Sequence, residues 1–69
     1  MKLVKEYISD DTLFPSDDEI KECVKIANDE DCIVRLKWYV EYSGWYTLTV
    51  TKGMTFDECR ARIPTCYPL

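Results

Sequence analysis

An alternation of apolar and polar residues between positions 32 and 51 is the feature that most constrains the fold. A period of two sends successive side chains to opposite faces of a β-strand, so a strand with one apolar face must be covered on that side. Gly44 divides the segment, and we predict strands over residues 32–42 and 45–51 that pair as an antiparallel hairpin. The side chains expected to face the core are Cys32, Val34, Leu36, Trp38, Val40, Tyr46, Leu48 and Val50.

The register of this hairpin is limited by the same pattern, because both apolar sets must lie on one face of the sheet. A two-residue Ser43-Gly44 turn fails this condition, since it sets Val40 opposite Thr47. A three-residue loop, Tyr42-Ser43-Gly44, keeps the faces together and places glycine where a left-handed backbone costs least. We therefore predict this loop, with Val40 opposite Tyr46, Trp38 opposite Leu48 and Leu36 opposite Val50.

Two capping boxes predict the starts of two helices. Ser16-Asp17-Asp18-Glu19 opens a helix at Asp17, and Thr55-Phe56-Asp57-Glu58 opens a second helix that Pro64 ends. Helical spacing gives each of them one apolar face. The residues expected on these faces are Ile20, Cys23, Val24 and Ala27 in the first helix, and Phe56, Cys59 and Ile63 in the second.

The spacing of residues 1–8 fits either a strand or a helix. We favour a strand, because a lone hairpin is barely stable in water and a third strand is the usual remedy. The chain of 69 residues is then one domain, 1–69, of the α+β class. Its expected order is β-α-β-β-α, with a small antiparallel sheet centred on the 32–42/45–51 hairpin and both helices packed on one face.

The charge of the chain is divided unevenly. Ten of the 13 acidic residues lie in residues 1–31 beside four lysines, whereas residues 32–69 hold three acidic and five basic residues, and the net charge is −4. Phosphates require a cationic surface, so we expect no direct binding to nucleic acid. An acidic chain better fits a larger, basic protein or a nucleoprotein complex as its partner.

Targeting signals are not visible in the sequence. No apolar run approaches the roughly 20 residues needed to span a bilayer. Residues 1–8 are too charged for the apolar core of a signal peptide. We expect no membrane association and a cytoplasmic location, which is the host cytoplasm if the protein is phage-encoded.

The residues most often used in catalysis are scarce. Histidine is absent, which removes the commonest general base near neutral pH. No phosphate-binding glycine loop, nucleotide-binding motif or nucleophile elbow is present. The carboxylates fall at expected turns and helix starts, where they act as caps or solvated charge. We therefore expect a protein that is not an enzyme and that binds no cofactor.

The four cysteines, Cys23, Cys32, Cys59 and Cys66, allow three interpretations. Four thiolates can hold zinc, but the closely spaced C-x2-4-C pair typical of such sites is missing. One or two disulfides are a second possibility, typical of short secreted chains. We favour buried free thiols, because the first three fall on predicted core positions, and we expect no metal site.

Two sets of residues are candidates for binding a partner. Aromatic and basic side chains on the outer side of the hairpin are typical of interface hot spots, although they could equally be ordinary cross-strand pairs. Acidic side chains of the N-terminal half could imitate a row of phosphates, although charged runs are usually only solvated. The first set is Tyr39, Tyr42, Trp45, Arg35 and Lys37, and the second is Asp17, Asp18, Asp29, Glu30 and Asp31.

In its small size, its acidity and its lack of catalytic residues, the chain resembles the small inhibitor proteins of bacteriophages and mobile elements, such as the anti-CRISPR proteins. The resemblance lies in these general features and involves no motif. It implies a non-enzymatic inhibitor or modulator of a host nucleic-acid-binding or defence (CRISPR-Cas) complex. Two alternatives are a structural or regulatory module that self-associates as a homodimer through the hairpin edge, and a small cysteine-based metal or redox protein.

Overall fold

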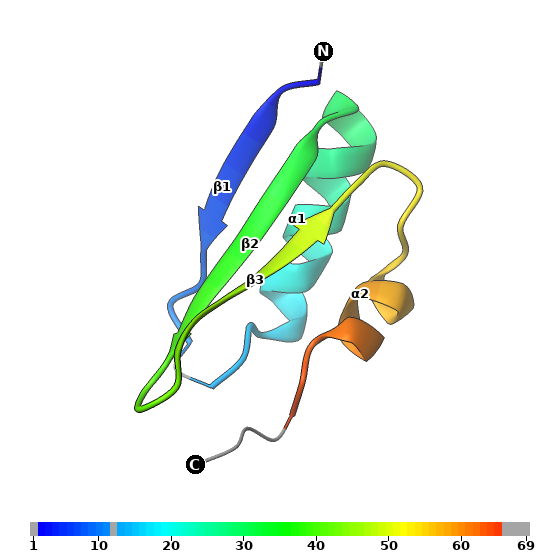
Figure 1. Cartoon of the computed structure of the whole chain (residues 1–69). Helices are drawn as coiled ribbons and strands as arrows, with labels where there is room; N and C mark the ends of the chain where they lie inside the picture. The colour runs from blue at the N-terminus through cyan, green and yellow to red at the C-terminus, as the bar shows by residue number, and fades with distance from the viewer. Residues whose placement is uncertain (1, 12, 66–69) are drawn as a thin grey trace.

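The chain forms a strand, a helix, two strands and a helix, in the order that the sequence predicts (Figure 1). The computed structural model describes residues 2–11 and 13–65. The three strands form one sheet in which the second strand lies in the centre. The elements are β1 (Val4–Ile8), α1 (Asp17–Glu30), β2 (Ile33–Val40), β3 (Gly44–Val50) and α2 (Phe56–Arg62).

The sheet is mixed, which corrects the prediction of an antiparallel sheet. β2 and β3 are antiparallel, but β1 and β2 run parallel, with Val4 beside Ile33 and Ile8 beside Lys37. The reason is the crossover through α1, which returns the chain to the end of the sheet where β1 began. Residues 4–8 are thus the predicted strand, in an orientation that α1 determines.

The hairpin pairs two residues away from the predicted register. Trp38 lies opposite Tyr46, whereas the predicted register placed it opposite Leu48. A shift of two residues leaves every side chain on its predicted face, so the apolar pattern alone cannot separate the two registers. The observed pairs on the core side are Val34 with Val50, Leu36 with Leu48, Trp38 with Tyr46 and Val40 with Gly44.

The hairpin loop is Glu41-Tyr42-Ser43, which corrects the predicted Tyr42-Ser43-Gly44. The Ser43 N–H donates to the Val40 carbonyl at 3.0 Å, and β3 begins directly afterwards at Gly44. Gly44 still has a left-handed backbone, with φ of 105°, but it follows the loop instead of closing it. The left-handed residue inside the loop is Tyr42, with φ of 69°. The sequence-based prediction placed only Gly44 in the left-handed conformation, whereas Tyr42 adopts it too.

Both capping boxes are present. The Ser16 hydroxyl accepts from the Glu19 N–H at 3.2 Å, and the Glu19 carboxylate accepts from the Ser16 N–H at 2.9 Å. Thr55 and Glu58 form the same pair of bonds at the start of α2. Neither helix in the described part of the chain has the length and apolar character needed to cross a lipid bilayer.

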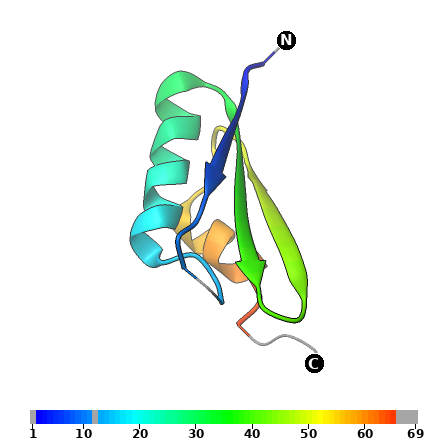
Figure 2. The same cartoon turned by 90° about the vertical axis from the view of Figure 1, so that its left-hand side faces the viewer.

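Both helices pack on one face of the sheet, as predicted (Figure 2). The core lies between these two layers and contains the predicted side chains of β2, with Val24, Tyr46 and Phe56 at its margin and partly buried. Its fully enclosed members include Ile20, Cys23, Ala27, Val34, Leu36, Val50 and Cys59. Among residues 2–11 and 13–65 no helix covers the opposite face of the sheet, and this face positions the candidate site.

Candidate functional site

The uncovered side of the sheet, here called the outer face, is built by alternate residues of all three strands. Strand pairing sets these side chains in rows that run across the sheet. Its middle rows are charged or polar except for Ile8, and its row nearest the hairpin loop is aromatic. The rows are Val4 with Ile33, Glu6 with Arg35 and Thr49, Ile8 with Lys37 and Thr47, and Tyr39 with Trp45.

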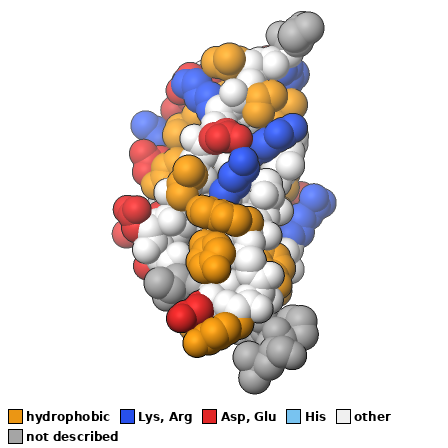
Figure 3. Space-filling view, turned by 60° about the vertical axis from the view of Figure 1, so that its left-hand side comes forward, with side chains coloured by type: hydrophobic (Ala, Val, Ile, Leu, Met, Phe, Trp, Pro, Cys, Tyr) orange, Lys and Arg blue, Asp and Glu red, His pale blue; other side chains and the backbone are white. Residues whose placement is uncertain are grey.

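The aromatic row is an exposed apolar part of this face. Tyr39 and Trp45 stand opposite each other in an edge-to-face arrangement, with ring centroids 5.4 Å apart. Their exposed fractions are 48% and 61%, and Tyr42 in the neighbouring loop is 92% exposed. Seen from the β1 side, hydrophobic side chains gather along the strands, with basic and acidic groups between them (Figure 3). The structure thus brings together the predicted aromatic residues of the hairpin.

A shallow open cleft of about 390 Å³ lies beside the aromatic row. Its walls are Ile8, Lys37, Trp45 and Thr47, so it crosses all three strands. Ile8 is 59% exposed. Ile8 is a site residue that the sequence does not reveal, because its position beside Lys37 depends on the parallel pairing of β1, which has no local signal in the sequence.

The positive charge of the outer face is partly neutralised. Lys37 donates to Glu6 at 2.8 Å, and Glu6 stands beside Arg35 in the next row. The hydrogen bond from Lys37 and its positive charge hold the pKa of Glu6 below its usual value. Arg35 and Lys37 are therefore on the predicted face, together with Glu6, which was not among the predicted site residues.

The five predicted acidic residues do not form one surface. Asp17 and Asp18 lie in the first turn of α1, whereas Asp29, Glu30 and Asp31 lie at its other end. A helix of 14 residues is about 20 Å long at a rise of about 1.5 Å per residue. The two groups are separated by this length, so a single partner surface would have to span the whole helix to contact both.

The acids at the end of α1 are paired with lysines of the same chain. Asp31 lies 2.6 Å from the Lys2 ammonium, which holds the pKa of Asp31 below its usual value. Glu30 pairs with Lys5, and Asp29 lies 3.9 Å from Lys25. The Lys2 and Lys5 contacts join the N-terminal segment to the end of the helix, and all three ion pairs reduce the negative charge that a partner would meet.

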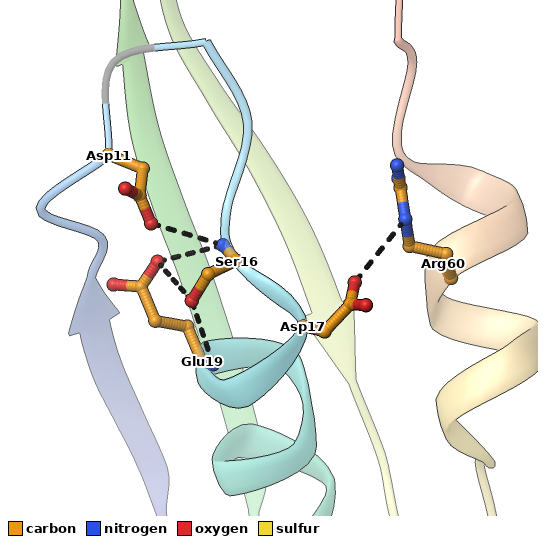
Figure 4. Close-up of polar contacts among 5 residues, drawn as sticks. All are labelled: Asp11, Ser16, Asp17, Glu19 and Arg60. Carbon is orange, nitrogen blue, oxygen red and sulfur yellow. Dashed lines mark hydrogen bonds and ion pairs between the residues drawn. The ribbon is translucent and has the colours of Figure 1, made fainter.

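Asp17, at the start of α1, faces α2. Its carboxylate lies 3.7 Å from Nε of Arg60 (Figure 4). The guanidinium of Arg60 also lies over the Phe14 ring, 5.1 Å from its centroid. Asp17 therefore joins the two helices, and Asp18 beside it is exposed.

Glu19 is the centre of a hydrogen-bond network before and at the start of α1 (Figure 4). Its carboxylate accepts from the Ser9 hydroxyl at 2.7 Å and from the Asp10 and Ser16 N–H groups. Partial burial raises the pKa of Glu19, but these hydrogen bonds outweigh burial and lower it to about 2. The neighbouring Asp11 has a raised pKa, chiefly because of its hydrogen bond with Glu19. The network fixes the segment between β1 and α1.

Cys23, Cys32 and Cys59 lie buried in the core as free cysteines, in the predicted positions. Cys66 falls outside the described residues. Burial raises the pKa of Cys23 to about 12 and also raises that of Cys59, which disfavours the thiolate that metal binding and redox chemistry require. Within residues 2–11 and 13–65, no group of three or more metal-ligating side chains is arranged to hold an ion.

Comparisons with known protein families, with curated proteins and with solved structures found no match. The function is therefore inferred from the geometry and chemistry of the outer face.

Proposed function

We propose that the chain is a small non-enzymatic protein that inhibits or modulates a larger protein by binding it through the outer face. The observation that carries this proposal is the exposed pair of Tyr39 and Trp45, 48% and 61% exposed, on a face that neither described helix covers. Exposed aromatic side chains held by a rigid sheet lose little freedom on binding, and tryptophan, tyrosine and arginine are the residues most enriched at interface hot spots.

The chemistry of the face suits a partner with a protruding apolar side chain. The cleft is lined by the apolar side chains of Ile8 and Trp45, together with Lys37 and Thr47. Arg35 adds an exposed cation one row away, where it can meet a carboxylate at the rim of an interface. An apolar centre with charged groups around it is the usual composition of a protein–protein interface.

The outer face is favoured over the acidic residues as the binding surface. Asp29, Glu30 and Asp31 are already paired with lysines of the same chain, and Asp17 contacts Arg60. A partner that used these acids would have to compete with those ion pairs. The aromatic residues, by contrast, present apolar area that water covers in the isolated protein, so burying it against a partner is favourable.

As the partner we propose a larger, basic protein or nucleoprotein complex, such as a host nucleic-acid-binding or CRISPR-Cas defence complex. Support for this choice comes from the net charge of −4, which attracts a basic partner over distance, and from the resemblance of the chain to small acidic phage inhibitors. In this arrangement the overall charge increases the rate of encounter and the outer face supplies the affinity.

The test compares binding by two double variants. The partner is captured from a lysate of the organism that carries the gene, purified, and titrated by calorimetry against each protein. The Tyr39→Ala/Trp45→Ala variant is expected to bind about 30-fold to 1,000-fold more weakly, as for the loss of two hot-spot residues. The Asp29→Asn/Asp31→Asn variant is the matched control and is expected to change affinity by less than about tenfold.

Two results would contradict the proposal. One is a partner that binds the aromatic double variant as tightly as the wild type while circular dichroism shows both proteins folded. The other is a loss of binding in the acidic control that exceeds the loss in the aromatic variant, which would move the site to α1.

A further inference from the structure

The free edge of β3 is a second surface, formed by backbone groups of residues whose side chains lie on the outer face. Backbone bonds between β1 and β2 show which residues point toward which neighbour. The Ser9 N–H donates to the Lys37 carbonyl at 2.8 Å, and the Ile33 N–H donates to the Leu3 carbonyl at 2.9 Å. Odd-numbered residues of β2 therefore bond to β1, and even-numbered residues bond to β3.

The same alternation fixes the backbone of β3. Its even-numbered residues pair with β2, so the N–H and C=O groups of Trp45, Thr47 and Thr49 point away from the sheet. β3 is the last strand of the sheet, and no described residue forms a backbone hydrogen bond on its far side. These three residues present a row of donors and acceptors at the sheet edge.

β3 lacks the charged residues and prolines that commonly protect an edge strand. Its seven residues, GWYTLTV, include no charged side chain and no proline. β1, at the other edge, is five residues long and contains Lys5 and Glu6. An uncharged strand of this length with aromatic and β-branched residues is a template for pairing with another strand.

We propose that the β3 edge pairs with the β3 edge of a second copy of this chain, in antiparallel orientation about a two-fold axis at Thr47. Thr47 then faces its own counterpart, and Trp45 faces Thr49 of the other copy. Every outward N–H of these three residues donates to an outward C=O across the axis. One continuous sheet results, with the outer faces of both copies on the same side. The inference goes beyond the proposed function and does not depend on it, because it uses backbone groups of the edge.

The absence of charged side chains on β3 makes pairing with a second copy possible at this edge. In an antiparallel pair of identical strands, the central residue meets itself, so a charged centre is repelled. The centre of the β3 edge is Thr47, which is neutral, and the flanking pairs are tryptophan with threonine, a favourable cross-strand combination. The same pairing at the β1 edge would set Glu6 against Glu6.

Proline at Thr47 is the sharpest test, because the Thr47 N–H points outward and makes no bond to β2. Sedimentation equilibrium is measured for the full chain from about 10 μM to about 1 mM, a range that covers moderately weak dimers. We expect the wild type to dimerise, and Thr47→Pro to weaken dimerisation about tenfold to a hundredfold. Thr47→Lys, which keeps the N–H but adds charge to the edge, is expected to act in the same direction.

Glu6→Pro is the matched control, because it removes the outward N–H at the centre of the β1 edge, and it is expected to leave dimerisation unchanged. Hydrogen exchange should show the amides of Trp45, Thr47 and Thr49 becoming more protected as concentration rises. A wild type that is monomeric throughout the range overturns the proposal. A folded Thr47→Pro variant that dimerises as tightly as the wild type also overturns it. So does a result in which Glu6→Pro or Tyr39→Ala/Trp45→Ala abolishes dimerisation and Thr47→Pro does not.

Discussion

Tyr39 and Trp45 face each other directly across the hairpin, with their ring planes at 66° and their centroids 5.4 Å apart. Such a pair stabilises the fold as well as offering a surface, and the two contributions can be measured separately. We expect a double-mutant cycle of the alanine variants in urea denaturation to give a coupling of about 0.5–1 kcal/mol. The domain should stay folded in each variant. A coupling near zero would mean that the rings do not interact in solution.

Tyr42 is a position where stability and binding should change in opposite directions. It is 92% exposed and has φ of 69°, a conformation that glycine adopts without steric cost. Tyr42→Gly is expected to raise the free energy of unfolding by up to about 1 kcal/mol, measured by urea denaturation. Tyr42→Ala is the control, because alanine also finds this conformation unfavourable, and no increase in the free energy of unfolding is expected. If Tyr42 contacts the partner, both variants also lose affinity, whereas a destabilised Tyr42→Gly would contradict the left-handed loop.

Glu19 makes the stability of the fold depend on pH in the acid range. Its pKa of about 2 lies below the ordinary value of 4.5, so the unfolded chain binds more protons between these values and the free energy of unfolding rises with pH there. Its contribution is complete above the ordinary pKa and is lost as the pH falls toward 2. We expect Glu19→Gln to flatten the pH dependence of urea denaturation over this range. An unchanged slope would contradict the network at the start of α1.

Asp11 affects the same pH dependence in the opposite direction, because its pKa is raised, and the amide of an Asp11→Asn variant can still donate to the Glu19 carboxylate. The folded chain holds the Asp11 proton more tightly than the unfolded chain does, so this group reduces stability as the pH rises above its ordinary pKa of 3.8. Asp11→Asn should therefore make the rise in stability with pH steeper. A flatter rise would mean that the two carboxyl groups do not interact as the structure describes.

The buried thiols should be unreactive until the protein unfolds. Cys23, Cys32 and Cys59 are each at most 1% exposed, so iodoacetamide should modify them only in denaturant. Mass spectrometry of a Cys66→Ser variant counts these three thiols alone. We expect no modification in buffer and three modifications in urea. Modification of any of them in buffer at the rate of a small free thiol would contradict the core that contains them.

Local chemistry made the helices and strand faces predictable. Ser16 with Glu19 and Thr55 with Glu58 are three residues apart, and this residue pair at this spacing is a local signal for the start of a helix. The alternation of β2 and β3 likewise determines which side chains face the core. The register of the hairpin could not be predicted in this way, because a shift of two residues satisfies the same alternation. The two registers differ in the loop, where Tyr42 has the left-handed conformation.

The part of the site contributed by β1 could not be predicted. Glu6 and Ile8 join the outer face only because β1 lies parallel to β2, and that pairing connects segments on either side of α1. The ion pairs of Lys2 and Lys5 with the end of α1 have the same origin. The sequence does not show whether a lysine more than twenty residues away will pair with a given carboxylate. For this reason the ion pairs of the acidic candidates could not be predicted.

The parallel pairing of β1 with β2 also sets an order of events during synthesis. β1 leaves the ribosome before β2, the strand with which it pairs in the described structure, and α1 lies between them in the sequence. The nascent chain therefore carries β1 unpaired until β2 has emerged, and loop-closure entropy makes its ladder slower to form than the local β2–β3 hairpin. Fast translation through residues 9–32 shortens the time for which β1 is available to chaperones or to other nascent chains.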